Sequence, residues 1–104
     1  MIPNIIIPDT IKRIEEYTFY NCTNLKSIEI NSNIEYIGSY AFYKCYNLTS
    51  ITINSTTVPT VSRPDILFTN CTSLQDIFVN SSLVDQYKSS EYWSQYADKI
   101  KAKE

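Results

Sequence analysis

The chain has 104 residues and a formal net charge of −2 at pH 7, with 43% of its residues hydrophobic and 19% charged. That length supports one domain with a single modest core, and the composition is typical of a folded globular protein. No run of Lys and Arg exceeds two residues, and no apolar run approaches the ~18 residues of a membrane span, so neither nucleic-acid binding nor membrane insertion is expected.

The first expected element is a strand over residues 3–7, and no basic or small-residue segment of a signal peptide precedes it. Its apolar spacing returns in three stretches, so further strands are expected at 26–30, 49–53 and 75–79. Each strand would pair in parallel with the next through a crossover connection. The matched positions are Ile2, Ile5 and Ile7; Leu25, Ile28 and Ile30; Leu48, Ile51 and Ile53; and Leu74, Ile77 and Val79.

A Phe-x-x-Cys segment precedes each of the last three strands, so the chain holds three copies of one unit, centred on 18–30, 41–53 and 67–79. The copies follow one another at intervals of 23 and then 26 residues. A period in the twenties with an L-x-x-I-x-I core is the signature of a leucine-rich-repeat solenoid. Residues 1–79 are therefore assigned to repeats, and the first strand belongs to a partial repeat, as in a solenoid cut within a unit.

The links between strands contain an I-x-x-I pair and then a short segment, 15–20 or 38–43, that leads into the next Phe. Apolar spacing of three residues fits one tight helical turn on the side opposite the strand. The third copy carries three extra residues in a link that contains Pro59 and Pro64. Proline should keep this link in a loop or an extended conformation.

The Phe and Cys slots should face inward in every copy. Three equivalent thiols are interpreted as a buried column in which Cys acts as a small hydrophobe, although the spacing of adjacent repeats would not forbid a disulfide. A zinc site lacks ligands, because the sequence has no His and no Cys-x-x-Cys. These structural residues are Phe19, Phe42, Phe68, Cys22, Cys45 and Cys71.

Nothing in the sequence predicts catalysis or a cofactor. Without His, neither a Ser–His–Asp nor a Cys–His arrangement can form. The single Gly cannot build a loop that cradles phosphate. The carboxylates of Glu15, Glu16 and Asp76 are interpreted as part of a solvated surface. We expect no catalytic, metal-binding or cofactor-binding residues.

Two sets of side chains are candidates for binding a partner. Alternation along the strands should turn one polar column and one mixed column outward from the sheet. Tyrosines next to the buried Phe and Cys slots should also point outward, where they either contact a partner or only shield the repeat backbone. The candidates on the sheet are Ser27, Glu29, Ser50, Thr52, Asp76 and Phe78, and the tyrosines are Tyr20, Tyr43 and Tyr46.

Residues 80–104 depart from the repeat and are expected to form a helical C-terminal cap. Ser82 and Asp85 have the spacing of a capping box. Trp93, Tyr96 and Ile100 continue an apolar helical stripe, and Trp93 should be buried against the last repeat. The expected fold class is thus α/β: a right-handed leucine-rich-repeat solenoid with a short parallel sheet, one helical turn per repeat and this cap.

The unit I-x-x-I…(A/T)-F-x-x-C-x-x-L-x-x-I-x-I resembles the BspA-type leucine-rich repeat. The match covers nearly the whole chain, and 84–88 and 93–100 resemble the tail that closes many such proteins. The chain departs from the family pattern at two positions. Glu15 stands where the middle copy has the expected Gly, Gly38, and Leu67 stands where the middle copy has the expected Ala, Ala41. The resemblance implies an extracellular or cell-surface protein that adheres to proteins of a host or of neighbouring cells, without catalytic residues.

We therefore expect a surface-adhesion module that binds proteins, or glycans, through the sheet face or the tyrosine-bearing side. The alternative is a passive structural end, a stalk or cap of a longer solenoid whose binding site lies elsewhere. Five N-x-S/T triplets begin at Asn21, Asn47, Asn54, Asn70 and Asn80, a number that chance explains in a chain rich in Asn, Ser and Thr. The edge strand at 4–7 favours a homodimer, whereas Pro3 and Pro8 beside it favour protection of that edge.

Overall fold

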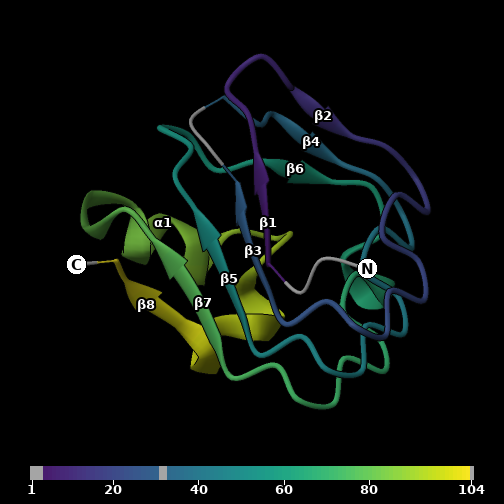
Figure 1. Ribbon diagram of the computed structural model, residues 1–104. Coiled ribbons are helices and arrows are strands. Elements are labelled where there is room, and N and C mark those ends of the chain that lie inside the picture. Colours follow the sequence, from purple (N-terminus) through teal and green to yellow (C-terminus); the bar gives the residue numbers. More distant parts are fainter. Residues whose placement is uncertain (1–3, 31–32, 104) are drawn as a thin grey trace.

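The computed structural model describes residues 4–30 and 33–103 of the chain. A five-stranded parallel sheet has the order β1-β3-β5-β7-β8, and a three-stranded parallel sheet has the order β2-β4-β6. Figure 1 shows how the chain coils so that each strand lies beside its counterpart in the next repeat. The strands of the large sheet are β1 (Asn4–Ile7), β3 (Ser27–Ile30), β5 (Ser50–Ile53), β7 (Asp76–Val79) and β8 (Ile100–Ala102).

The expected strands at 26–30, 49–53 and 75–79 are confirmed, each beginning one residue later than expected. The first is confirmed over 4–7, and its expected start at residue 3 lies outside the described residues. The repeat slots pair in register, with Ile28 opposite both Ile5 and Ile51. An α/β repeat fold with parallel strands therefore follows from the apolar spacing.

The core consists of the inward slots of neighbouring repeats. In β3, β5 and β7 buried residues alternate with half-buried ones, as expected for a sheet with one covered face. The rings of Phe19 and Phe42 stack with centroids 5.5 Å apart, and those of Phe42 and Phe68 with centroids 5.6 Å apart. Burying each side chain of this size contributes about 1.5–3 kcal/mol, so the repeated slots supply most of the hydrophobic stabilisation.

The I-x-x-I links form a second sheet that the sequence analysis did not predict. Its strands hold the second apolar residue of each pair in a buried position and expose or half-bury the residue before it. Two-residue strands carry too little alternation to be recognised from a sequence. They are β2 (Arg13–Ile14), β4 (Tyr36–Ile37) and β6 (Thr60–Val61).

The expected helical turn in each repeat is wrong for the first two copies. Their short segments are successive turns closed by backbone hydrogen bonds of the i to i−3 type, such as the N–H of Tyr20 to the carbonyl of Tyr17 at 3.1 Å. The third copy, where proline was expected to prevent a helix, has the 3₁₀ helix η1 (Pro64–Ile66). Proline is tolerated there because the first helical position needs no N–H donor.

The C-terminal segment, residues 80–103, combines short helices with a strand. It contains the 3₁₀ helix η2 (Ser81–Leu83), the α-helix α1 (Val84–Ser89), the 3₁₀ helix η3 (Ser94–Lys99) and β8. The assignment of Ile100 to a helical stripe is wrong, because Ile100 pairs with Ile77 in the large sheet. The capping box is wrong as well, since Leu83 is the N-cap of α1 and no side chain caps that helix.

Candidate partner-binding surfaces

The outward face of the large sheet carries the two expected columns in register. One runs from Asn4 through the two serines to Asp76, and the other ends beyond Phe78 at Lys101. All six candidates on this face are half-buried. Lys101 is an addition that the sequence analysis missed, because β8 had been assigned to a helix. The six candidates are Ser27, Glu29, Ser50, Thr52, Asp76 and Phe78.

Several polar groups on this face are already used within the chain. The hydroxyl of Ser27 donates to the side-chain oxygen of Asn4 at 2.6 Å, and Lys101 forms an ion pair with Asp76. The amide nitrogen of Asn54 donates to a carboxylate oxygen of Glu29 at 3.0 Å. These contacts link neighbouring strands, so much of the hydrogen-bonding capacity of the face stabilises the sheet itself.

Four tyrosines on the turns of the first two repeats form a continuous cluster, which we call the tyrosine array. The rings of Tyr17 and Tyr40 stack with centroids 5.1 Å apart and an interplanar angle of 5°. Tyr20 and Tyr43 lie 5.4 Å apart, and two further ring contacts, Tyr17–Tyr20 at 5.5 Å and Tyr40–Tyr43 at 5.2 Å, close the square. Tyr17 is 56% exposed and Tyr20 40% exposed, while the other two are half-buried.

Only two members of this array, Tyr20 and Tyr43, are among the candidates expected from the sequence. Tyr17 and Tyr40 are not among them, although their spacing of 23 residues is the repeat interval that links Tyr20 to Tyr43. That shared interval was the available signal. Tyr46 is 40% exposed and lies outside the ring contacts found among the described residues.

The backbone of the array is held in an unfavourable conformation. Tyr17 and Tyr40 have φ values of 64° and 60°, in the left-handed region, where residues other than Gly, Asn and Asp are uncommon. The third repeat avoids this conformation, because Ile66 occupies the corresponding position as the last residue of η1. A repeat of this fold therefore forms without a left-handed tyrosine.

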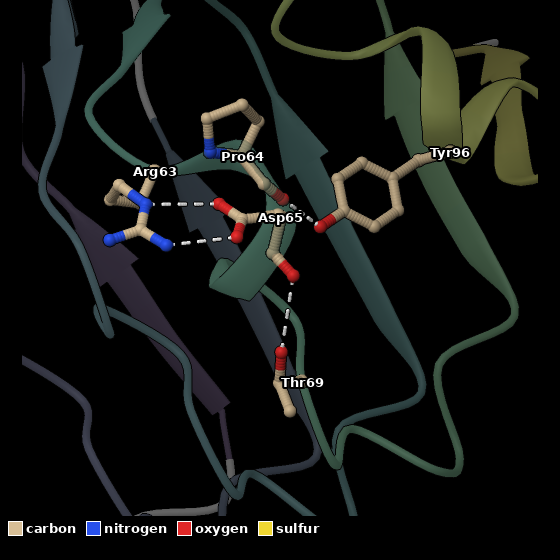
Figure 2. A network of polar contacts seen from close by, with 5 residues as sticks. All are labelled: Arg63, Pro64, Asp65, Thr69 and Tyr96. Atoms are coloured by element: carbon tan, nitrogen blue, oxygen red, sulfur yellow. Dashed lines mark hydrogen bonds and ion pairs between the residues drawn. The ribbon is translucent and has the colours of Figure 1, made fainter.

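Two ion pairs lie in the connections of the repeats. The guanidinium of Arg13 contacts Glu15 at 3.0 Å and lies 4.1 Å from the ring centroid of Tyr36. Arg63 makes two parallel hydrogen bonds to Asp65, at 3.1 and 3.0 Å, as Figure 2 shows. This guanidinium lowers the pKa of the Asp65 carboxyl, so the pair stays ionised and neutral overall near pH 7.

The cysteines lie in one slot but in different environments. Cys45 and Cys71 are buried, and their thiols donate to the carbonyls of Phe19 and Phe42 at 3.1 and 2.9 Å. Cys22 is only half-buried. All three are free thiols, and within the described ranges no group of three or more His, Cys, Asp or Glu side chains could hold a metal ion.

The asparagines that begin the N-x-S/T triplets differ in the hydrogen bonds of their side chains. The amide nitrogen of Asn47 donates to the carbonyl of Thr23 at 2.6 Å, and that of Asn80 donates to Ser55 at 2.9 Å. Asn21 and Asn70 are exposed and have positive φ values of 59° and 67°. These two occupy left-handed turn positions that Asn tolerates better than most residues.

No pocket opens in the part of the chain that the structure describes, and among residues 4–30 and 33–103 no helix is long and apolar enough to cross a membrane. A family model described as the BspA type leucine rich repeat region (6 copies) matches residues 1–100. No curated protein matches the chain. The candidate surfaces are thus broad faces of stacked repeats rather than a cleft.

Proposed function

Because the chain belongs to the BspA-type leucine-rich repeat family, we propose that it is a surface adhesion module that binds proteins of a host or of neighbouring cells. The family suggests a protein-binding repeat module, is generally non-enzymatic, and is typically associated with cell surfaces. The proposal of adhesion goes further than a protein-binding module, because it requires that the protein lie outside the cell and that its partner lie on another surface.

The observation that carries the proposal is the tyrosine array. Tyrosine offers a large rigid ring with a polar tip, and it loses little conformational entropy when it is buried by a partner. Four contacting rings make a patch in which each ring is already fixed by its neighbours. Such preorganised aromatic anchors are the residues that dominate the energetics of protein interfaces.

The left-handed tyrosines support a binding role over simple shielding of the backbone. A residue held in a sparsely populated region costs on the order of 1–3 kcal/mol and is often found at binding sites. Tyr17 and Tyr40 could be replaced by Asn with less strain, and the third repeat needs no such residue. Shielding alone would not favour tyrosine over Asn at these two positions.

The sheet face is the weaker candidate. Its polar side chains are half-buried and several are bonded to one another. Breaking those contacts to bind a partner would cost about as much as the new contacts contribute. We therefore propose that the partner binds the tyrosine array rather than the sheet face.

The test compares the parent chain with a double variant, Tyr17→Asn and Tyr40→Asn. Asn accepts the left-handed backbone, so relief of strain should offset the lost ring contacts, which contribute about 0.5–1.5 kcal/mol per pair. We expect the melting temperature to stay within a few degrees. Binding to immobilised extracellular-matrix proteins and to cultured cells should fall at least tenfold.

Tyr46→Asn is the matched control, because it removes an exposed tyrosine outside the array. It should leave binding unchanged. Equal binding by the parent and by the folded double variant would rule out the array as the contact surface. If the parent binds none of these surfaces, the passive structural end becomes the better account of the chain.

A further inference from the structure

The rings of Tyr17 and Tyr40 are held beside each other by the backbone as well as by their own contact. The N–H of Tyr17 donates to the carbonyl of Ser39 at 3.2 Å, and the N–H of Phe19 donates to the carbonyl of Ala41 at 2.8 Å. The two acceptors flank Tyr40 in the chain, and both tyrosines share the left-handed backbone conformation. The two turns therefore present equivalent rings in register, one repeat apart.

This pair is closely packed and also open to solvent. Its ring planes differ by only 5° at a centroid distance of 5.1 Å, an offset-stacked arrangement in which equivalent carbons of the two phenols lie side by side. Tyr17 is exposed and Tyr40 is half-buried. An oxidant in solution can therefore reach the ring of Tyr17, and a radical formed there meets a second phenol without diffusion.

We propose that Tyr17 and Tyr40 are a site of oxidative cross-linking, at which a peroxidase-type one-electron oxidant with hydrogen peroxide joins the two rings as dityrosine. This modification goes beyond the binding of a partner and does not depend on it. Each phenol loses one electron and its proton, which gives two tyrosyl radicals. The radicals form a bond between one ring carbon ortho to each hydroxyl, and the hydrogens of these two carbons move to the phenolic oxygens. Two electrons and two protons leave the pair in total, and they reduce hydrogen peroxide to two water molecules.

The tyrosine array favours coupling within one chain over coupling between chains. Two reactants that are held in contact react in an effectively unimolecular step. The other two rings extend this advantage, since Tyr20 contacts Tyr17 at 5.5 Å and Tyr43 contacts Tyr40 at 5.2 Å, so a radical on either can pass to the stacked pair. Tyr46 is as exposed as Tyr20 but takes part in none of the ring contacts among the described residues. A radical on Tyr46 therefore has no adjacent ring with which to couple.

The stacked pair fits this coupling better than the other contacts of the array do. The rings of Tyr20 and Tyr43 are tilted by 37°, and those of Tyr40 and Tyr43 lie at 86°. Parallel rings in register keep the ortho carbons of both residues at the same height, whereas a tilt moves some of these carbons apart. The two contacts within a turn join residues only three positions apart. The bond between Tyr17 and Tyr40 is the one that links two repeats through equivalent ring atoms.

Such a bond would tie the first repeat to the second. It joins positions that are 23 residues apart in the chain, and a link of this kind restricts the unfolded chain more than the folded one. The cross-linked protein should therefore melt at a higher temperature. In the third repeat Ile66 and Thr69 occupy the slots of Tyr40 and Tyr43. Among the described repeats the site is thus confined to the first two.

Oxidation of the dilute protein by a haem peroxidase and hydrogen peroxide tests the proposal. We expect dityrosine fluorescence from a chain that stays monomeric and is lighter by two hydrogen atoms. Fragmentation mass spectrometry of a digest should place the link between Tyr17 and Tyr40. Tyr17→Phe keeps the stacked ring but cannot form a tyrosyl radical, so it should lose most of the fluorescence. Tyr46→Phe is the matched control outside the array and should retain the fluorescence, as should Tyr20→Phe.

Each measurement is repeated in a Cys22→Ser background, because the half-buried thiol of Cys22 can reduce a tyrosyl radical before it couples. Absence of dityrosine in both backgrounds, or equal fluorescence from the parent and Tyr17→Phe, would overturn the proposal. A link found only between chains would do the same, as would a cross-linked monomer whose melting temperature is unchanged. A loss in Tyr20→Phe as large as that in Tyr17→Phe would contradict the assigned pair.

Discussion

The two ends of the repeat stack are covered very differently. At the C-terminal end β8 adds a fifth strand, and Ile100 is buried opposite Ile77. Trp93 is fully buried, and its ring nitrogen donates to the carbonyl of Pro59 at 3.0 Å. At the N-terminal end the corresponding slots, Ile5 and Ile7, are half-buried, and no described strand pairs with the outer side of β1.

This difference shows what is needed to bury the last unit of such a stack. One component is a further strand that places an apolar residue beside the inward residues of the preceding strand, as β8 places Ile100 beside Ile77. The other is a set of aromatic rings that covers the Phe slot, since Trp93 and Tyr96 lie 6.4 and 4.9 Å from Phe68 by ring centroid. Both side chains also donate hydrogen bonds to backbone carbonyls of the longer link in the third repeat, Trp93 to Pro59 and Tyr96 to Pro64 (Figure 2 shows Tyr96 on Pro64). The longer link thus provides acceptors that the shorter repeats do not use in this way.

The largest expected effect comes from removing the aromatic anchor of the covered end. Trp93→Ala should lower the free energy of unfolding by about 3–5 kcal/mol, because it leaves a cavity beside Phe68 and Tyr87 and an unpaired carbonyl at Pro59. Urea denaturation followed by circular dichroism measures this. Tyr46→Ala, at an exposed position, should change stability by less than about 0.5 kcal/mol. A stable Trp93→Ala variant would mean that the C-terminal segment contributes little to the core.

The sequence predicted the repeated parts of the molecule far better than this covered end. Slots such as Ile28 and Ile51 recur, so each copy tests the interpretation of the others. β8 has no copy to compare with, and its three residues include a lysine in a Lys-rich stretch. Its conformation is set by pairing with β7, which overrides the local pattern. A helical stripe was the natural interpretation of the same spacing.

The next effect contrasts the interior of the stack with the first repeat. A Cβ added to Gly38 would lie 2.5 Å from the backbone nitrogen of Glu16, in the preceding repeat. Gly38→Ala should therefore force a backbone shift that costs about 1–3 kcal/mol. Glu15 occupies the same slot in the first repeat and is exposed, so Glu15→Ala should change stability by no more than about 0.5 kcal/mol. Equal losses in chemical denaturation would contradict the close approach.

The candidate surfaces were predictable to the extent that they repeat. The columns that contain Ser27 and Glu29 followed directly from strand alternation. The left-handed backbone of Tyr17 did not, because nothing in tyrosine signals a positive φ. Ring contacts between neighbouring turns also depend on how far the repeats are rotated, and the repeat interval alone does not specify that rotation.

Two tyrosines of the C-terminal segment, the buried Tyr87 and the half-buried Tyr96, should respond oppositely to removal of the hydroxyl. Tyr96 donates to the carbonyl of Pro64, so Tyr96→Phe should destabilise the protein by about 1 kcal/mol. The hydroxyl of Tyr87 is buried and has no hydrogen-bond partner among the described residues. Tyr87→Phe should therefore leave stability unchanged or raise it. A loss in both variants, measured by thermal unfolding, would show that Tyr87 has an acceptor or an ordered water.

Tyr96 also predicts a loss of stability at high pH. Burial raises its pKa to about 12, above the ~10 of an unfolded tyrosine. Its contribution is fully present below pH ~10 and is lost as the pH rises through about 12, because only the unfolded state can ionise in between. The melting temperature of the parent should fall more between pH 9 and pH 11 than that of Tyr96→Phe. Parallel pH curves for the two proteins would contradict this prediction.

The smallest effect separates the half-buried cysteine of the first repeat, Cys22, from the two buried cysteines of the later repeats. The thiol of Cys45 is buried and bonded to the carbonyl of Phe19, and its pKa is raised by its neighbour Cys71 and by burial. Serine at this position could use the same carbonyl, so Cys45→Ser should cost only about 1 kcal/mol, and Cys22→Ser should cost less. Rates of labelling resolve the difference better than stability does. In native buffer Cys22 should react with a thiol reagent well before Cys45 and Cys71, which should react only in denaturant. Equal labelling of all three would mean that the first repeat is as well covered as the others.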